Sequence, residues 1–244
     1  MASFTKAPHL ISPMNQSTAG WINGLIGVLI FSGSLPATRL AVMEFDPVFL
    51  TGARAVIAGL LGGGLLLALK EKRPGRNDFT SLALVALGCV VAFPLFTALA
   101  LQHITSAHSM VFIGALPLTT AVFAVLRGGD RPRPAFWVFS LLGCALVSGY
   151  ALRQDMHIAP VGDVLMLGAI VTCGLGYAEG ARLSGHLGGW QVISWALVLS
   201  LPVMGPLTWF TAPPTFETIH APAWWGLASV SQLQLLQPFL GLAW

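Results

Sequence analysis

The chain has 244 residues, of which only 9% are Asp, Glu, Lys or Arg, whereas 55% are hydrophobic. Roughly a quarter of the residues in an average soluble protein are charged, so this composition excludes a water-exposed globular domain. The formal net charge of +3 comes from short basic clusters between apolar runs. This distribution favours a lipid bilayer as partner and argues against nucleic acid.

Residues 1–18 contain one lysine and no apolar core of signal-peptide length, so we expect a short cytoplasmic tail before a retained first anchor. A helix needs roughly 20 apolar residues to cross about 30 Å of hydrocarbon. Eight segments have this length: 20–43, 47–69, 79–101, 107–126, 134–152, 161–183, 189–210 and 222–244. None alternates apolar and polar residues as barrel strands do. The sequence therefore predicts an all-α integral membrane protein.

Basic residues lie on alternate connections between these segments. On one side they are Lys6, Lys70, Lys72, Arg73, Arg76, Arg127, Arg131, Arg133 and Arg182. The loops of the other side carry Glu44, Asp46, Asp155 and Glu217, with Arg153 as the one basic exception. Because cytoplasmic loops retain Lys and Arg, the N-terminus is predicted to be cytoplasmic.

An internal repeat is indicated by an offset of 141 residues, which aligns Gly33 in the first segment with Gly174 in the sixth. The same offset carries Phe79, which opens the third segment, to position 220, near the start of the eighth. Five segments then form one repeat, and an odd number places the second copy upside down in the membrane. We predict a first repeat over 19–153 and an incomplete second repeat over 159–244.

The second repeat looks shortened near its end. The offset carries Pro117 to position 258, whereas the proline in the matching sequence context is Pro238, so about 20 residues are inferred to be absent between Ser229 and Gln232. The last segment would then join parts of two helices. We expect a shortened form of a ten-helix protein, with about eight spans present.

Four short runs resemble a known family. Phe31-Ser-Gly-Ser-Leu-Pro-Ala-Thr-Arg39 and Asp46-Pro-Val-Phe-Leu-Thr-Gly-Ala-Arg54 resemble the opening of an EamA-type member of the drug/metabolite transporter (DMT) superfamily. Gly162-Asp163 and Gln232-Leu-Gln-Leu-Leu-Gln-Pro238 are similar to that family's second repeat. The resemblance implies ten helices in two inverted five-helix repeats, a central cavity, and export of small metabolites, such as amino acids or drugs, across the bacterial inner membrane.

Two arginines lie at or within apolar segments, where a charge costs about 2.5–3.5 kcal/mol at the bilayer centre. For Arg39 we expect a structural role, in which it reaches the headgroups or pairs with Glu44 or Asp46. Arg54 lies about two turns deeper, and for it a structural and a substrate-binding role both stay open. Glu179 could carry a coupling proton, but a structural pair with Arg182 at i+3 is the competing interpretation.

Other candidates are prolines, amides and aromatic residues inside the segments. Prolines break helix hydrogen bonds and line transporter cavities, although a purely structural kink is as common. Membrane amides bind substrates or join helices, and Trp195 is a better cavity candidate than the tryptophans near segment ends. The complete set of substrate-cavity candidates is Ser32, Pro36, Arg54, Pro94, Pro117, Tyr177, Glu179, Trp195, Gln234 and Gln237.

The leading functional hypothesis is a secondary transporter that exports a small organic solute by alternating access. No phosphate-binding loop of the Gly-x-x-x-x-Gly-Lys-Ser/Thr type is present, so we do not expect ATP hydrolysis. Cys89, Cys144 and Cys173 lie far apart in apolar runs, so we expect no metal site, and we expect no cofactor. An intramembrane enzyme is the alternative, although His-Glu-x-x-His is absent and neither Ser32 nor Ser34 has an evident partner. A truncated, non-transporting membrane protein is a third hypothesis. A homodimer is left open.

Overall fold

The computed structural model describes residues 25, 29, 32–129, 131–152, 159–215 and 219–239, except for the side chains of 151–152 and 232–239. Every regular element in these ranges is helical. Five helical stretches among them are long and apolar enough to cross a membrane: Pro47–Ala68, Arg76–His103, Ser106–Gly128, Pro160–Leu187 and Gly189–Phe210. The prediction of an all-α membrane protein is thus confirmed, while the predicted tail 1–18 lies outside the described residues.

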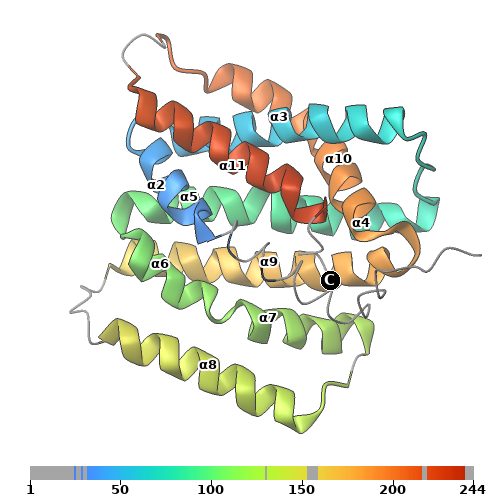
Figure 1. Cartoon of the computed structure of the whole chain (residues 1–244), viewed down its shortest axis with the longest axis vertical. Helices are drawn as coiled ribbons and strands as arrows, with labels where there is room; N and C mark the ends of the chain where they lie inside the picture. Colours follow the sequence, from blue (N-terminus) through green and yellow to red (C-terminus); the bar gives the residue numbers. More distant parts are fainter. Residues whose placement is uncertain are drawn as a thin grey trace, which may run out of the picture.

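The helices follow the predicted segments in order (Figure 1). They are α2 (Ser34–Val42), α3 (Pro47–Ala68), η1 (Arg76–Asp78), α4 (Phe79–Val85), η2 (Ala86–Ala92), α5 (Phe93–His103), α6 (Ser106–Ile113), α7 (Leu116–Phe123), η3 (Ala124–Gly128), α8 (Pro134–Leu152), α9 (Pro160–Leu187), α10 (Gly189–Phe210) and α11 (Ala221–Phe239). The third segment therefore consists of α4, η2 and α5, with η1 directly before it, and the fourth of α6, α7 and η3.

Local signals set where several helices start. The Asp46 carboxylate accepts hydrogen bonds from the backbone N–H groups of Val48 and Phe49, at 2.8 and 3.1 Å, and Pro47 occupies the first position of α3. The Thr105 hydroxyl accepts from the N–H of His108 at 3.2 Å at the start of α6. Both caps satisfy amide groups that have no partner within the helix. Asp46 is therefore a cap rather than the partner of Arg39.

A π-helix, η2, lies directly before Pro94. Proline has no N–H to donate to the carbonyl four residues earlier, which here belongs to Val90, and its ring crowds that carbonyl. The helix widens in response, and the Phe93 N–H bonds to the carbonyl of Gly88 five residues before it. Such π segments recur at functional sites. The prediction that Pro94 perturbs its helix is confirmed.

Pro117 accompanies a complete break in the fourth segment. Helix α6 ends at Ile113, α7 starts at Leu116, and Pro117 cannot donate to the Ile113 carbonyl. The carbonyl of Gly114 in the break accepts a hydrogen bond from the Cys144 thiol of α8 at 3.4 Å. In contrast, Pro202 and Pro206 lie within α10, where the loss of two N–H donors does not end the helix.

The helices pack as an inverted repeat requires. Helix α3 runs antiparallel to α10, because Gly52 faces Thr208 near one end of the pair and Gly62 faces Ser194 near the other. The first helix of each half, α2 or α9, packs against the third helix of the other half, which is α11 for α2 and the η2–α5 stretch for α9 (Figure 1). The limits 19–153 and 159–244 of the repeats stay predictions.

Two glycines let these corresponding helices approach closely. A side chain at Gly88 of η2 would collide with the carbonyl of Thr172 and with Gly176 on α9. A side chain at Gly226 of α11 would collide in the same manner with the Ala37 carbonyl on α2. In both cases only a residue without a Cβ leaves room for the opposing backbone. A close backbone contact of this kind thus occurs in both of these pairings between the halves.

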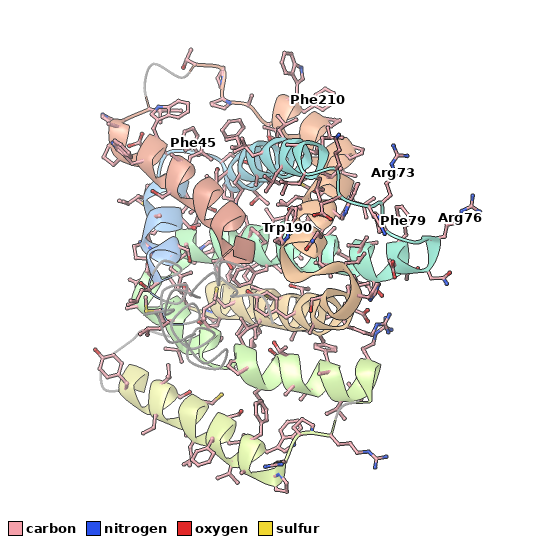
Figure 2. The ribbon with its side chains drawn as sticks, turned by 45° about the vertical axis from the view of Figure 1, so that its right-hand side comes forward. Phe45, Arg73, Arg76, Phe79, Trp190 and Phe210 are labelled. Atoms are coloured by element: carbon pink, nitrogen blue, oxygen red, sulfur yellow. The ribbon has the colours of Figure 1, made fainter. Side chains whose placement is uncertain are left out.

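The outer surface is apolar. Leu67, Trp209 and Phe210 are 81%, 81% and 83% exposed, and large hydrophobic residues of α8 are exposed as well. Water would not tolerate so much contiguous apolar area, but hydrocarbon covers it at little cost. Arg73 and Arg76 lie at one end of the bundle and Phe45 lies at the other (Figure 2). We call the end that carries Arg73 and Arg76 the basic end.

Candidate functional site

Most hydroxyl groups within the helices bond to their own backbone. The hydroxyls of Thr38, Thr172 and Thr208 each donate to the carbonyl four residues earlier, at 2.8, 2.8 and 2.6 Å. This bond removes the cost of placing a hydroxyl in an apolar environment. A membrane threonine that makes it is thereby satisfied without any external partner.

Thr51 and Thr97 differ from these threonines. Their side chains are 2% and 4% exposed, and neither hydroxyl has a hydrogen-bond partner among the residues that the structure describes. Thr51 lies on α3 and Thr97 on α5, and these helices pack together, with Ala53 and Ala98 in one buried cluster. A buried unpaired hydroxyl is costly, so two of them on adjacent helices make this region a candidate ligand site.

Arg54 follows Thr51 on the same helix and is partly buried. Pro94, one turn before Thr97, is buried and ends the π segment of the opposing helix. The fold therefore brings two predicted site residues, Arg54 and Pro94, onto a pair of packed helices that also carry two hydroxyls. Guanidinium and hydroxyl groups are both suited to binding a carboxylate, which accepts charge-assisted hydrogen bonds.

Glu179 lies in a different place. Its carboxylate is buried and pairs with Arg127 Nε at 2.6 Å and with Arg182 Nη2 at 3.4 Å. Arg182 also donates to the Ser81 hydroxyl at 2.7 Å. The structural pair with Arg182 is confirmed, whereas Arg127 was not anticipated. This cluster joins α9, η3 and α4 near the basic end, and both carboxylate oxygens face guanidinium groups of the protein itself.

Arg39 has neither of the acidic partners expected from the sequence. Its guanidinium donates to the carbonyl of Leu101 at 2.6 Å and to the carbonyl of Ile104, both at the C-terminal end of α5. The last carbonyls of a helix have no intrahelical donor and carry partial negative charge, which explains why a cation binds there. Arg39 is thus structural, as predicted, but the predicted pairing with Glu44 or Asp46 is wrong.

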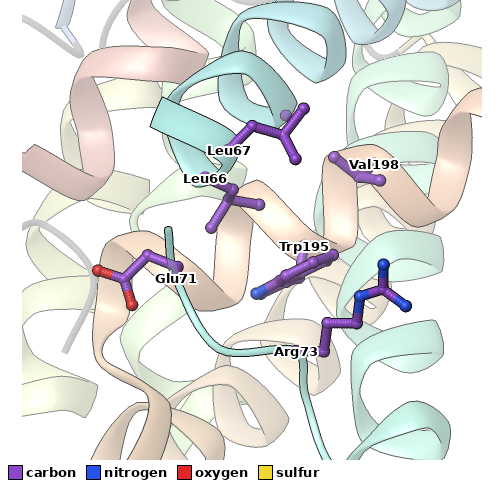
Figure 3. A pocket seen from close by; sticks show the side chains of 7 residues that line it. Leu66, Leu67, Glu71, Arg73, Trp195 and Val198 are labelled. Carbon is purple, nitrogen blue, oxygen red and sulfur yellow. The ribbon is translucent and has the colours of Figure 1, made fainter. Parts of the chain in front are cut away.

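Trp195 lines a pocket of about 430 Å³ between α3 and α10 (Figure 3). The other lining residues are Gly63, Leu66, Leu67, Glu71, Arg73 and Val198. The indole Nε1 of Trp195 is buried and has no hydrogen-bond partner among the described residues. Trp195 therefore faces a pocket that opens beside Arg73 at the basic end, while its place in a substrate cavity stays a prediction.

The remaining candidates are dispersed. Tyr177 packs, partly buried, against a cluster that contains Leu116, next to Pro117. Ser32 and Pro36 are exposed on the first segment, and the Ser32 hydroxyl donates to the Leu29 carbonyl at 2.6 Å. The side chains of Gln234 and Gln237 lie outside the described residues. Residues 32–129, 131–152 and 159–215 contain no group of three or more His, Cys, Asp or Glu side chains arranged to hold a metal ion.

These observations define a class of protein. Inverted halves, a broken helix, a π segment and buried polar groups at membrane depth together characterise helical membrane transporters. The chain matches the EamA-like transporter family over residues 18–149, more than half of its length. It belongs to the EamA-like transporter family, and it is a multi-pass membrane protein.

Relatives of the chain carry transporter names. It is 59% identical to the uncharacterized transporter YdeK of Bacillus subtilis over 253 residues, which cover 94% of this chain and 88% of the relative. It is 26% identical to an uncharacterized transporter of Archaeoglobus fulgidus, over 57% of this chain and 50% of the relative. It is 25% identical to the uncharacterized inner membrane transporter YedA of Escherichia coli K12, over 64% of this chain and 51% of the relative.

The alignment with the Bacillus relative also bears on the inferred gap. It extends over 253 residues, although 94% of a 244-residue chain is a smaller number. The relative therefore has residues inside the aligned region that this chain lacks. This agrees with the shortening inferred from the repeat, without locating it between Ser229 and Gln232.

Proposed function

We propose that the chain is a secondary transporter that exports small organic solutes carrying a carboxylate, such as amino acids, across the bacterial inner membrane. The single observation that carries this proposal is the group formed by Thr51, Arg54 and Thr97 on α3 and α5. Its two buried hydroxyls lack partners among the described residues, and a cation lies on the same helix pair. A solute carboxylate supplies acceptors for the two hydroxyls and a charge opposite to that of the guanidinium.

Alternating access is supported by the helices themselves. The break before Pro117 and the π segment before Pro94 are positions where a helix bends at low cost. The two halves meet through buried apolar clusters, and also through close glycine contacts and the Arg127–Glu179 ion pair. The basic end is proposed to be cytoplasmic because Lys and Arg accumulate on that side, which places the N-terminus in the cytoplasm.

Flux measurements with purified protein in liposomes test the proposal. The vesicles are loaded with a labelled zwitterionic amino acid, its decarboxylated amine or its amide, and solute release is followed. Only the carboxylate-bearing solute is expected to leave, and Arg54→Gln is expected to reduce the initial rate about tenfold or more, because a hydrogen bond to a charged group is lost. Arg54→Lys should retain part of the rate, since the positive charge remains.

Thr38→Val is the matched control, because the Thr38 hydroxyl bonds to the Ser34 carbonyl and its loss should leave flux unchanged. Equal flux of all three solutes would contradict carboxylate recognition. Conversion of a solute without release would indicate the intramembrane enzyme instead. A folded protein with no flux of any solute would indicate a non-transporting membrane protein.

A further inference from the structure

The described residues form three histidine–carboxylate pairs. His108–Asp163, at 2.9 Å, joins the starts of α6 and α9, and the other two tie helix ends together at opposite ends of the bundle. At the basic end, His186 Nε2 lies 3.1 Å from Asp78 Oδ1 and joins the end of α9 to the start of α4. At the other end, His220 Nδ1 lies 3.1 Å from Glu44 Oε1 and joins the start of α11 to the end of α2. The backbone N–H of His220 also donates to Glu44 Oε2 at 2.6 Å.

The two pairs are related by the internal repeat. His220 follows Asp78 by 142 positions, and His186 follows Glu44 by the same 142 positions, one more than the offset predicted from the sequence. Each pair therefore joins the end of the first helix of one repeat to the start of the third helix of the other. Inversion of the second repeat explains why the equivalent pairs lie at opposite ends of the bundle (Figure 1).

The chemical roles within the pairs are exchanged. In Asp78–His186 the carboxylate belongs to the third helix and the imidazole to the first helix. In Glu44–His220 the carboxylate belongs to the first helix and the imidazole to the third. Both repeats therefore contain a carboxylate–imidazole contact at equivalent positions, although the residue type at each position differs between the repeats. Because the contact recurs with the carboxylate and the imidazole interchanged, the common feature of the two pairs is a hydrogen bond between these two groups.

We propose that Asp78–His186 and Glu44–His220 are two matched latches, which close the basic end and the opposite end of the transport path in turn. This inference rests on the proposed alternating access. Both latches are formed in this structure, and opening of one end separates one of them. At the basic end the hydrogen bond from Arg182 to Ser81 joins the same two helices, α9 and α4, and separates together with the Asp78–His186 pair.

The exposure of the pairs suits reversible opening. The side chains of His186 and Asp78 are 55% and 19% exposed, and those of His220 and Glu44 are 79% and 29% exposed. Polar side-chain pairs in contact with water bias an equilibrium only about two- to fivefold, so thermal motion opens them readily. The carboxylate of Glu179 is fully buried, and its pair with Arg127 is much more costly to separate. The exposed histidine–carboxylate pairs and the Arg182–Ser81 hydrogen bond are the parts that open, while the buried Arg127–Glu179 pair stays formed.

Distances between spin labels on the protein in liposomes test the latches. One label pair is attached at Asn77→Cys and Gly185→Cys beside the basic-end latch, and a second at Met43→Cys and Ala221→Cys beside the other. Both are placed in a Cys89→Ser, Cys144→Ser, Cys173→Ser background, because these three cysteines are free. A cysteine at Gly185 has open space around it, and Met43 is 66% exposed, so the labels disturb little.

His186→Gln is expected to raise the population of long distances at the basic end about two- to fivefold without raising it at the other end. Glu44→Gln should produce the converse pattern, and His220→Gln provides a second variant of that latch if Glu44→Gln folds poorly. The double change Glu44→His with His220→Glu reproduces the arrangement of the Asp78–His186 pair. It is therefore expected to restore the original distances.

Unchanged distances in the single variants would overturn the proposal. So would a double change that folds but fails to restore the short distance. Flux is measured on the same samples, which separates this proposal from the transport function. If distances shift as expected while no solute crosses, the latches are supported and the transport assignment fails. If solute crosses while distances stay constant, transport is supported and the latches are refuted.

Discussion

Replacement of Thr97 by valine removes a buried hydroxyl and leaves the side-chain volume almost unchanged. The hydroxyl has no partner among the described residues, and the side chain is 4% exposed. A polar group buried without a hydrogen bond costs about 1–3 kcal/mol. Thr97→Val should therefore increase the free energy of unfolding by up to that amount. Thr51→Val should behave alike, since Thr51 is 2% exposed and its hydroxyl also lacks a partner.

The same Thr97→Val change is expected to lower the rate of transport, although it raises the free energy of unfolding. If the Thr97 hydroxyl donates to the carboxylate of the solute, its loss removes a charge-assisted hydrogen bond and reduces flux about tenfold. Stability is measured by reversible unfolding in mixed micelles with increasing denaturing detergent, and flux in liposomes made from the same preparation. Thr38→Val again serves as control, with both quantities nearly unchanged because its hydroxyl is already bonded to the backbone.

A stable Thr97→Val variant with full flux would refute the assignment of this hydroxyl to the solute site. A loss of more than about 1 kcal/mol of stability would show instead that the hydroxyl has a structural partner, because that is the size of a typical net hydrogen bond. Either result would remove the main support for a carboxylate site between α3 and α5.

Two further predictions concern stability. Arg127→Gln should destabilise the protein more than Glu179→Gln, by up to about 3 kcal/mol, because it leaves the buried Glu179 carboxylate poorly compensated. Glu179→Gln leaves only arginine side chains without their partner, and these are about half exposed and stay hydrated. Equal losses of stability in detergent unfolding would contradict this prediction. Gly88→Ala should also destabilise the protein, because its Cβ would collide with the Thr172 carbonyl. In the control Gly143→Ala the Cβ meets open space, so the free energy of unfolding should rise by about 0.5–1 kcal/mol from helix propensity. An unchanged stability of Gly88→Ala would argue against the close contact of η2 and α9.

The membrane segments could be predicted because hydrocarbon imposes length and apolarity on each of them. Residues 189–210 match α10, and 47–69 differs from α3 by a single residue. Helix α9 continues beyond the predicted end at 183 to Leu187. The extension contains Ser184 and His186, and a helix continues past the hydrocarbon as long as its backbone hydrogen bonds are retained.

The site could be predicted only in part. Arg54 is a charge in an apolar run and is visible in the sequence, whereas Thr51 and Thr97 look the same as Thr38 or Thr172 until the packing shows which hydroxyls bond to their own backbone. The partner of Glu179 on η3 was missed because 52 positions separate Arg127 from it. Such contacts depend on how helices from the two halves meet, which local patterns do not encode.

Counterflow most directly tests whether a solute crosses the membrane through this bundle. Liposomes containing the wild-type protein are filled with an unlabelled amino acid and diluted into a trace of the same labelled compound. A secondary transporter that alternates between two open states should concentrate the label inside transiently, and Arg54→Gln should abolish this accumulation. If protein-containing and empty liposomes took up the label equally, the account of this chain as a carboxylate-binding transporter would be contradicted.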